Sequence, residues 1–220
     1  MPLLECRGLS CSRGPLGAEE GSSIHDISAR FEPGRFYSFH GPEGCGKNLL
    51  LSVLGLLEPA DAGSITIAGQ DTSDWDEDDR RQACNEVFGF LFAHPCLLPS
   101  FSVAENVAMP LFRICEIDAR QARERTVEVL EFVGLAHCED TLASRLDPAE
   151  KHRAALARAI VHGPRILAAS SPREEDVLLP LAHRCAKELG LCVLWAGDSP
   201  LLSQYSDESI AMRDGRISAT

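Results

Sequence analysis

The sequence has no long apolar run and no basic leader at its N-terminus. Its densest apolar stretch, Leu49–Leu57, is far shorter than the roughly 18 residues that a membrane-spanning helix needs. The first residues, Met-Pro-Leu-Leu-Glu-Cys, carry neither the basic nor the apolar segment of a secretion signal. We therefore expect a protein that is not secreted and that reaches a membrane only through a partner.

Basic residues are also scarce. The chain has 21 Lys and Arg against 33 Asp and Glu, a formal net charge of -12. Phosphate backbones attract basic surfaces, so this excess of acid argues against a nucleic-acid partner. Much of the acid lies in Asp71–Asp79, which we predict to be a solvated loop.

The cysteines lack the spacing of a metal site. None of the nine forms a Cys-x-x-Cys pair, and none has a His nearby at a metal-binding spacing. We interpret them as reduced, mostly buried thiols of a cytosolic protein, and not as zinc ligands or a disulfide framework.

No repeat, low-complexity segment or linker divides the chain, so we predict one domain over residues 1–220. Strands alternate with helices after residue 36, which predicts an α/β fold with a mostly parallel sheet and an antiparallel β edge. The predicted strands are Leu3–Cys6, Ile24–Phe31, Phe36–His40, Ser64–Ile67, Phe88–Phe92, Arg165–Ala169, Cys192–Ala196 and a terminal hairpin within 209–218. The predicted helices are Lys47–Leu57, Val103–Cys115, Ala119–Val133, Pro148–His162 and Glu174–Leu189.

The most specific motif is a glycine-rich loop between a predicted strand and a predicted helix. It fits G-x-x-x-x-G-K at every fixed position, but Asn48 stands where Ser or Thr is expected. Glycines let backbone N–H groups surround a phosphate, the helix N-terminus adds positive potential, and Lys47 reaches the outer phosphates. The predicted nucleotide-binding residues are Gly41, Pro42, Glu43, Gly44, Cys45, Gly46, Lys47, Asn48 and Leu49.

With this loop as the anchor, the whole chain resembles an ABC transporter ATPase, most closely the stand-alone subunits of the lipoprotein-releasing and macrolide-export type. Cys96–Leu111 is similar to the segment after the family's glutamine loop. Residues 153–160 resemble the helix after the family's signature motif, and Met212–Ile217 resembles its closing hairpin. The resemblance implies a P-loop NTPase fold of the ABC ATPase type, with a helical subdomain at approximately residues 94–147.

The resemblance also implies partners. Family members dock on an integral-membrane ABC permease at the inner, cytoplasmic face of the cell membrane. They pair head to tail as homodimers, or as heterodimers with another ABC ATPase subunit. Each composite site then takes its phosphate loop and carboxylates from one subunit and its signature from the other.

The same alignment finds substitutions at the family's catalytic positions. The glutamine falls at Ala93, with His94 one residue out of register. The magnesium-site aspartate and the catalytic glutamate fall at Ser170 and Ser171, and the switch histidine falls at Gly197. We therefore predict no catalytic residue and no metal ligand, because none of these side chains keeps its chemistry.

The family's signature motif is replaced by residues of different chemistry. Where the family has Leu-Ser-Gly-Gly-Gln or Glu, this chain has Leu146–Glu150, with Pro148 removing one N–H group. Asp147 at the N-cap and Glu150 at the third helical position predict a capping box with a proline start. In the family this helix end binds a phosphate. Here we expect its N–H groups to be capped by Asp147 and Glu150 instead.

Three functions stay open from the sequence. The favoured one is a transporter subunit that binds ATP weakly, without a Mg²⁺ requirement, and does not hydrolyse it. Arg13, at the family's adenine-stacking position, either stacks on the base or is merely exposed. The alternative is a divergent but active transport ATPase. The third is a nucleotide sensor without a permease, against which Cys96–Leu111 argues, because the family's equivalent segment abuts the permease.

Overall fold

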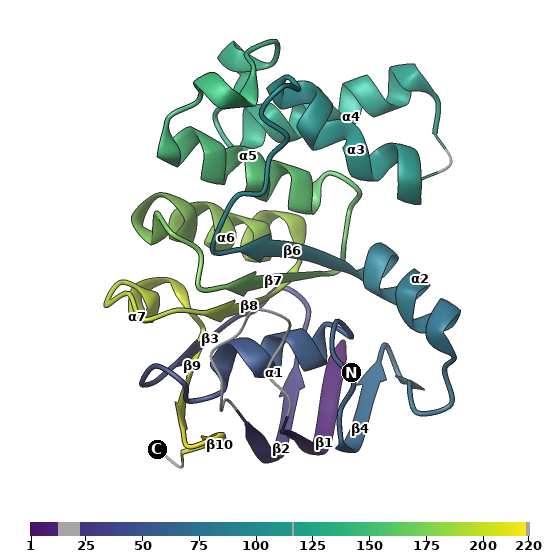
Figure 1. Cartoon of the computed structure of the whole chain (residues 1–220), viewed down its shortest axis with the longest axis vertical. Coiled ribbons are helices and arrows are strands. Elements are labelled where there is room, and N and C mark those ends of the chain that lie inside the picture. The colour runs from purple at the N-terminus through teal and green to yellow at the C-terminus, as the bar shows by residue number, and fades with distance from the viewer. Residues whose placement is uncertain (13–22, 116, 219–220) are drawn as a thin grey trace.

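Two sheets form the framework of the structure, a computed structural model that describes residues 1–12, 23–115 and 117–218 (Figure 1). One sheet has the strand order β10-β9-β3-β8-β7-β6, and the other has the order β2-β1-β4-β5. The strands are β1 (Leu4–Cys11), β2 (Ile24–Phe31), β3 (Phe36–His40), β4 (Ala62–Ile67), β5 (Gln70–Asp71), β6 (Phe88–Phe92), β7 (Ile166–Ser170), β8 (Cys192–Ala196), β9 (Glu208–Arg213) and β10 (Arg216–Ile217). The helices are α1 (Lys47–Leu54), α2 (Glu77–Val87), α3 (Val103–Ile114), α4 (Ala119–Phe132), α5 (Pro148–Ile160), α6 (Glu175–Leu189) and α7 (Leu202–Tyr205), with the 3₁₀ turns η1 (Ala136–Cys138) and η2 (Ala143–Arg145).

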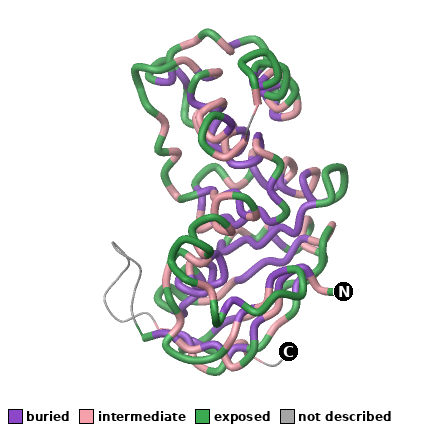
Figure 2. The backbone as a smooth tube through the Cα atoms, turned by 90° about the vertical axis from the view of Figure 1, so that its right-hand side faces the viewer, coloured by how far each residue is buried: buried purple, intermediate pink, exposed green. Residues whose placement is uncertain are grey.

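The central strands of the larger sheet are buried on both faces. Strand β8 is apolar throughout, as expected for a parallel strand covered from two sides. Its residues Val193 and Trp195 pack in the core shared with α3 to α6, whereas Cys192 and Leu194 pack in a second core with α1 and the antiparallel sheet. Figure 2 shows the buried residues concentrated along these strands. The parallel and antiparallel sheets confirm the predicted α/β architecture.

Helix α1 lies between the two sheets (Figure 1). Its residues Leu50, Val53 and Leu54 are fully buried there. The helix was predicted to extend to Leu57 but ends at Leu54, where Gly55 forms its C-cap. A Cβ at Gly55 would lie 2.7 Å from the Phe90 ring of β6, so only glycine fits this close approach.

The acidic segment Asp71–Asp79 was predicted to be a loop, but its last three residues form the start of α2. Asp76 caps that helix by accepting a hydrogen bond from the Asp79 backbone N–H at 2.8 Å. Acidic side chains in a first turn also suit the positive end of the helix dipole. Because no described residue of α2 is buried, the helix has no apolar stripe for the sequence to reveal.

The predicted terminal hairpin is present, and its first strand also extends the parallel sheet. Strand β9 pairs in parallel with β3, and Tyr37 lies opposite Glu208. Strand β10 pairs antiparallel with β9, which closes the predicted hairpin. In the part of the chain that the structure describes, no helix has both the length and the apolarity needed to cross a membrane.

Candidate functional site

The glycine-rich loop joins the end of β3 to the start of α1, as predicted. Gly46, the N-cap of α1, has φ 92° and ψ 2°, in the left-handed region that favours glycine. A Cβ there would lie 2.6 Å from the Ser23 carbonyl oxygen. Within the loop, Pro42, Glu43 and Gly44 are exposed, whereas Cys45, Lys47 and Leu49 are buried, and a hollow of about 570 Å³ lies beside it against His40, Asp198 and Ser199.

The N-terminus of α1 differs from those of the next four helices. Helices α2, α3, α4 and α5 each begin with a capping box, in which a side chain accepts the first N–H groups. At α1, no described side chain caps the helix and the first turn has no acidic residue. Its first N–H groups are left without helical partners and face the loop, which is the arrangement that binds a phosphate.

Lys47 is held inside the loop. It is only 6% exposed, and its Nζ donates a hydrogen bond to the Gly41 carbonyl oxygen at 3.0 Å. The same Nζ lies 3.0 Å from Oδ2 of Asp198, whose side chain is 63% exposed. A bound phosphate would have to share or displace this carboxylate.

Asn48, Ser170 and Ser171 form a closed hydrogen-bonded cluster. Oδ1 of Asn48 accepts hydrogen bonds from the hydroxyls of Ser170 and Ser171, both at 3.0 Å. The carboxyl end of β7 brings the two serines to the first turn of α1. The amide oxygen that could have contacted a cation is therefore occupied by two donors from the positions of the magnesium and catalytic carboxylates.

Gly197, the switch position, faces a carboxylate that the sequence did not single out. A Cβ at Gly197 would overlap Oε1 of Glu175. That oxygen accepts a hydrogen bond from Trp195 Nε1 at 2.8 Å, and Oε2 accepts one from the Ser199 N–H at 3.1 Å. Burial raises the pKa of Glu175 above its ordinary range, and these two donors oppose the rise. No local spacing could have revealed Glu175, because it resembles any acidic residue in a first helical turn.

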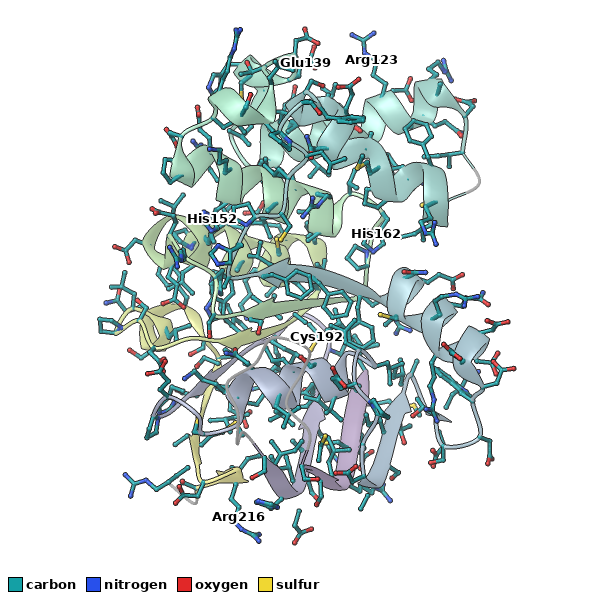
Figure 3. The ribbon with its side chains drawn as sticks, in the orientation of Figure 1. Arg123, Glu139, His152, His162, Cys192 and Arg216 are labelled. Carbon is teal, nitrogen blue, oxygen red and sulfur yellow. The ribbon has the colours of Figure 1, made fainter. Side chains whose placement is uncertain are left out.

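The glutamine position Ala93 follows β6 and is tied to α5. Its carbonyl oxygen lies 3.3 Å from Nε2 of His152, whose Nδ1 lies 2.9 Å from the Pro148 carbonyl oxygen. Figure 3 shows His152 on α5, beside the end of β6. Arg158 donates to the carbonyl oxygens of Pro95 and Cys96, both at 2.7 Å. The backbone after β6 is thus held by α5, while the Ala93 methyl group offers nothing to a cation, and His94 is exposed.

The capping box predicted at the start of α5 is confirmed. Asp147 Oδ1 accepts a hydrogen bond from the Glu150 N–H at 2.7 Å, and Glu150 Oε2 accepts one from the Asp147 N–H at 3.0 Å. Pro148 occupies the first turn of the helix. The first N–H groups of α5 are therefore capped by its own side chains, whereas those of α1 have no described side-chain cap.

Two further predictions concern Arg13 and the cysteines. Arg13 lies outside the described residues, so its predicted contact with a base stays a prediction. Six of the nine cysteines are buried, which agrees with the prediction that they are mostly buried.

The chain has close relatives among known proteins. Residues 24–172 match the ABC transporter family. The chain is 34% identical over 226 residues to the lipoprotein-releasing system ATP-binding protein LolD 2 of Caulobacter vibrioides, with 98% of this chain and 96% of that protein covered.

Solved structures of ATP-binding cassettes have the same fold. The dimeric, post-hydrolysis structure of the cassette MJ0796 bound to ADP and Pi matches with a TM-score of 0.85 and 23% identity, over 98% of this chain and 97% of that one. The cbiO1 protein of Clostridium perfringens, part of the ABC transporter complex cbiONQ, matches with a TM-score of 0.86 and 21% identity, over 99% and 87% of the two chains. These matches confirm the predicted P-loop fold of the ABC ATPase type.

Proposed function

The chain belongs to the ABC transporter family as an ATP-binding subunit, and from this premise we propose that it binds nucleotide without hydrolysing it. The observation that carries the proposal is the cluster of Asn48, Ser170 and Ser171, in which one amide oxygen accepts two hydroxyl hydrogen bonds. Neutral hydroxyls replace the carboxylates that would hold the metal ion and activate water.

Phosphoryl transfer depends on positioning and on stabilising charge, and here both are reduced. A positioned general base typically contributes 10²–10⁴-fold in rate, and a serine at position 171 cannot supply it at neutral pH. Loss of metal-ion stabilisation would come on top of that factor. The open α1 start and the buried Lys47 still support binding of the phosphates themselves.

The start of α5 supports the same proposal from the other half of a composite site. In a head-to-tail pair it would face the nucleotide of the partner subunit with Asp147 instead of a serine and glycines. Like charges at about 4 Å repel by about 4 kcal/mol at an effective dielectric near 20, before screening by salt. The chain would thus bring an altered carboxylate set to one composite site and an altered signature to the other, even beside an intact paralogue.

We propose an integral-membrane ABC permease as the partner, with the chain at the inner, cytoplasmic face of the membrane as a homodimer or as a heterodimer with another ABC ATPase subunit. The LolD 2 relative is named as part of a lipoprotein-releasing system, cbiO1 is part of a transporter complex, and MJ0796 is dimeric. We also propose that the chain is a single domain over residues 1–220, in which residues 94–147 approximately form the helical subdomain.

The alternative is a divergent but active ATPase, and Glu175 is the observation that favours it. Its carboxyl group is partly buried beside Gly197, and burial raises its pKa. A raised pKa is typical of a carboxyl group that serves as a general base. Against this role, both of its oxygens already accept hydrogen bonds from Trp195 and Ser199.

A phosphate-release assay on the purified protein separates the two functions. We expect no ATPase activity above that of a Lys47→Ala variant. Turnover near 1 s⁻¹, which is ordinary for enzymes, that disappears in Lys47→Ala would establish the alternative. Loss of that turnover in Glu175→Gln would then assign the base.

A further inference from the structure

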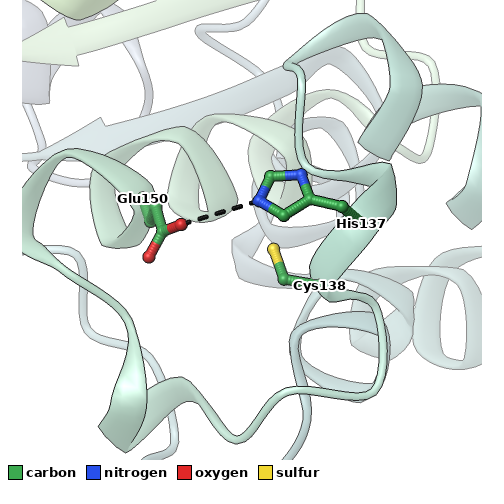
Figure 4. A group of neighbouring side chains, drawn as sticks. All are labelled: His137, Cys138 and Glu150. Atoms are coloured by element: carbon green, nitrogen blue, oxygen red, sulfur yellow. Dashed lines mark ion pairs between the residues drawn. The ribbon is translucent and has the colours of Figure 1, made fainter.

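We propose that His137, Cys138 and Glu150, none of which belongs to the phosphate loop, form a binding site for a thiophilic divalent cation of the zinc class. One imidazole nitrogen, one thiol sulfur and one carboxylate oxygen of these residues all lie within 4.8 Å of one another. Figure 4 shows the three side chains converging from η1 and from the first turn of α5. The site would join these two elements through a single ion.

The donor atoms are of the kind that zinc binds, and those of His137 and Glu150 are nearly at the required separation. Zinc binds imidazole nitrogen, thiolate sulfur and carboxylate oxygen with bonds of about 2.0–2.3 Å, so a tetrahedral ion holds its donors about 3.3–3.8 Å apart. Nε2 of His137 lies 3.8 Å from Oε1 of Glu150. Three protein ligands leave the fourth position of the shell to water.

The two carboxylate oxygens of Glu150 have separate contacts. Oε2 accepts the capping hydrogen bond from the Asp147 N–H, whereas Oε1 faces His137. An ion at Oε1 would therefore leave the capping box intact. The carboxylate that closes the start of α5 is thus also placed to serve as a ligand.

Cys138 is buried, whereas the neighbouring His137 is exposed. Cys138 is 6% exposed, and its thiol donates to the Leu135 carbonyl oxygen at 3.3 Å. The side chain of His137 is 67% exposed, which gives an ion a path from solvent. Burial and Glu150 raise the pKa of Cys138, whereas Arg153 lowers it. Divalent cations bind the thiolate form, so binding at Cys138 releases its proton.

The sequence did not indicate this site, because its third ligand comes from another element. His137 and Cys138 are adjacent, a spacing that matches no common zinc motif, and Glu150 follows only after the η2 turn. The cysteines were predicted not to ligate zinc because of their spacing along the chain, which does not reveal a ligand from another element. None of the magnesium positions belongs to this cluster. The cation site uses none of the phosphate-loop residues, so a cation titration tests it separately from nucleotide binding at Lys47.

A cobalt titration of the full chain tests the proposal. Co²⁺ reports thiolate ligation through a charge-transfer band in the near ultraviolet, and we expect this band to saturate at one equivalent. In Cys138→Ser the band should vanish, and in His137→Ala the affinity should fall at least about tenfold, since even outer-shell partners of a metal typically contribute 10–100-fold. Glu150→Gln should weaken binding similarly while keeping the capping box, in which Gln also serves.

Matched controls distinguish this site from other thiols and imidazoles of the chain. Cys96→Ser removes an exposed cysteine, and His94→Ala removes an exposed histidine, so both should bind Co²⁺ like the unmodified chain. Zn²⁺ should raise the melting temperature of the unmodified chain and of the controls, but not of His137→Ala. The proposal is overturned by the absence of the band, by equal binding in His137→Ala, or by loss of the band in Cys96→Ser.

Discussion

The hydroxyl of Ser170 donates a hydrogen bond to Oδ1 of Asn48 at 3.0 Å, across the gap between β7 and α1. In the family this gap is where an aspartate and a hydroxyl would share a magnesium ion. Here the two side chains contact each other directly, and Ser171 donates to the same oxygen. The substitutions are therefore mutually compatible, since the amide oxygen takes two neutral donors and leaves no carboxylate unpaired.

This cluster predicts that ATP binding does not depend on magnesium. The loop N–H groups and Lys47 would contact the phosphates directly, whereas the Asn48 amide and the Ser170 hydroxyl are weak ligands for a cation. Titration calorimetry should give the same Kd with and without Mg²⁺ to within about threefold, a difference below about 1 kcal/mol. The double variant Asn48→Ser, Ser170→Asp should regain a magnesium dependence. A large magnesium effect in the unmodified chain would mean that another side chain ligates the ion.

The ion pair between Lys47 and Asp198 predicts that Asp198→Asn binds ATP more tightly. The carboxylate competes with phosphate for Nζ of Lys47 at 3.0 Å, and its charge repels the nucleotide. Because Asp198 is mostly exposed, the pair is worth only about 0.2–1 kcal/mol, so affinity should rise by no more than about fivefold.

Asp74→Asn is the control for Asp198→Asn, since Asp74 is exposed in the segment before α2 and its replacement makes the same change in charge. Calorimetry at low salt should show the gain in ATP affinity in Asp198→Asn alone. Equal gains in both variants would point to net charge, and a loss of affinity in Asp198→Asn would assign Asp198 to the binding site itself.

The approach of Glu175 to Gly197 predicts that even a methyl group at position 197 is destabilising. In Gly197→Ala the new Cβ would displace Oε1 of Glu175, and the Trp195 N–H would lose its acceptor. An unsatisfied buried donor costs about 1–3 kcal/mol, and denaturant unfolding should show a loss of that size.

A double-mutant cycle tests this cause. Glu175→Ala removes the same acceptor, so Gly197→Ala should add little to it, and the two effects should be far from additive. Additive effects would show that the Glu175 carboxylate is not what excludes a side chain at position 197.

These contacts mark what the sequence could and could not predict. Strands β3, β6 and β8 were predicted with their observed bounds, because each is a short apolar run between polar segments. The capping box from Asp147 to Glu150 was predictable because its partners lie three residues apart. Helix α2 was missed because none of its described residues is buried. Glu175 was missed because its contact with Gly197 joins the start of α6 to the end of β8, which only the tertiary fold brings together.

A single restored residue should not restore hydrolysis. Ser171→Glu would return a carboxylate to the position of the general base, but Ala93, Ser170 and Gly197 would stay unchanged. Catalytic groups that act as a unit are strongly non-additive, so phosphate release should stay at the level of Lys47→Ala. Clear turnover in Ser171→Glu would show that the other positions have functional substitutes.

The capping box predicts opposite effects for two substitutions at one position. Asp147→Ala removes the acceptor of the Glu150 N–H and should lower the free energy of unfolding by about 0.5–2 kcal/mol. Asp147→Ser should be mild, because a serine hydroxyl also caps well. Pro148→Gly should destabilise as well, since proline fixes the first helical φ and glycine loosens it. Denaturant unfolding of the three variants decides between a structural cap and a nucleotide contact. If Asp147→Ala and Pro148→Gly are neutral, the self-capped start of α5 does not explain why this segment departs from the family's signature.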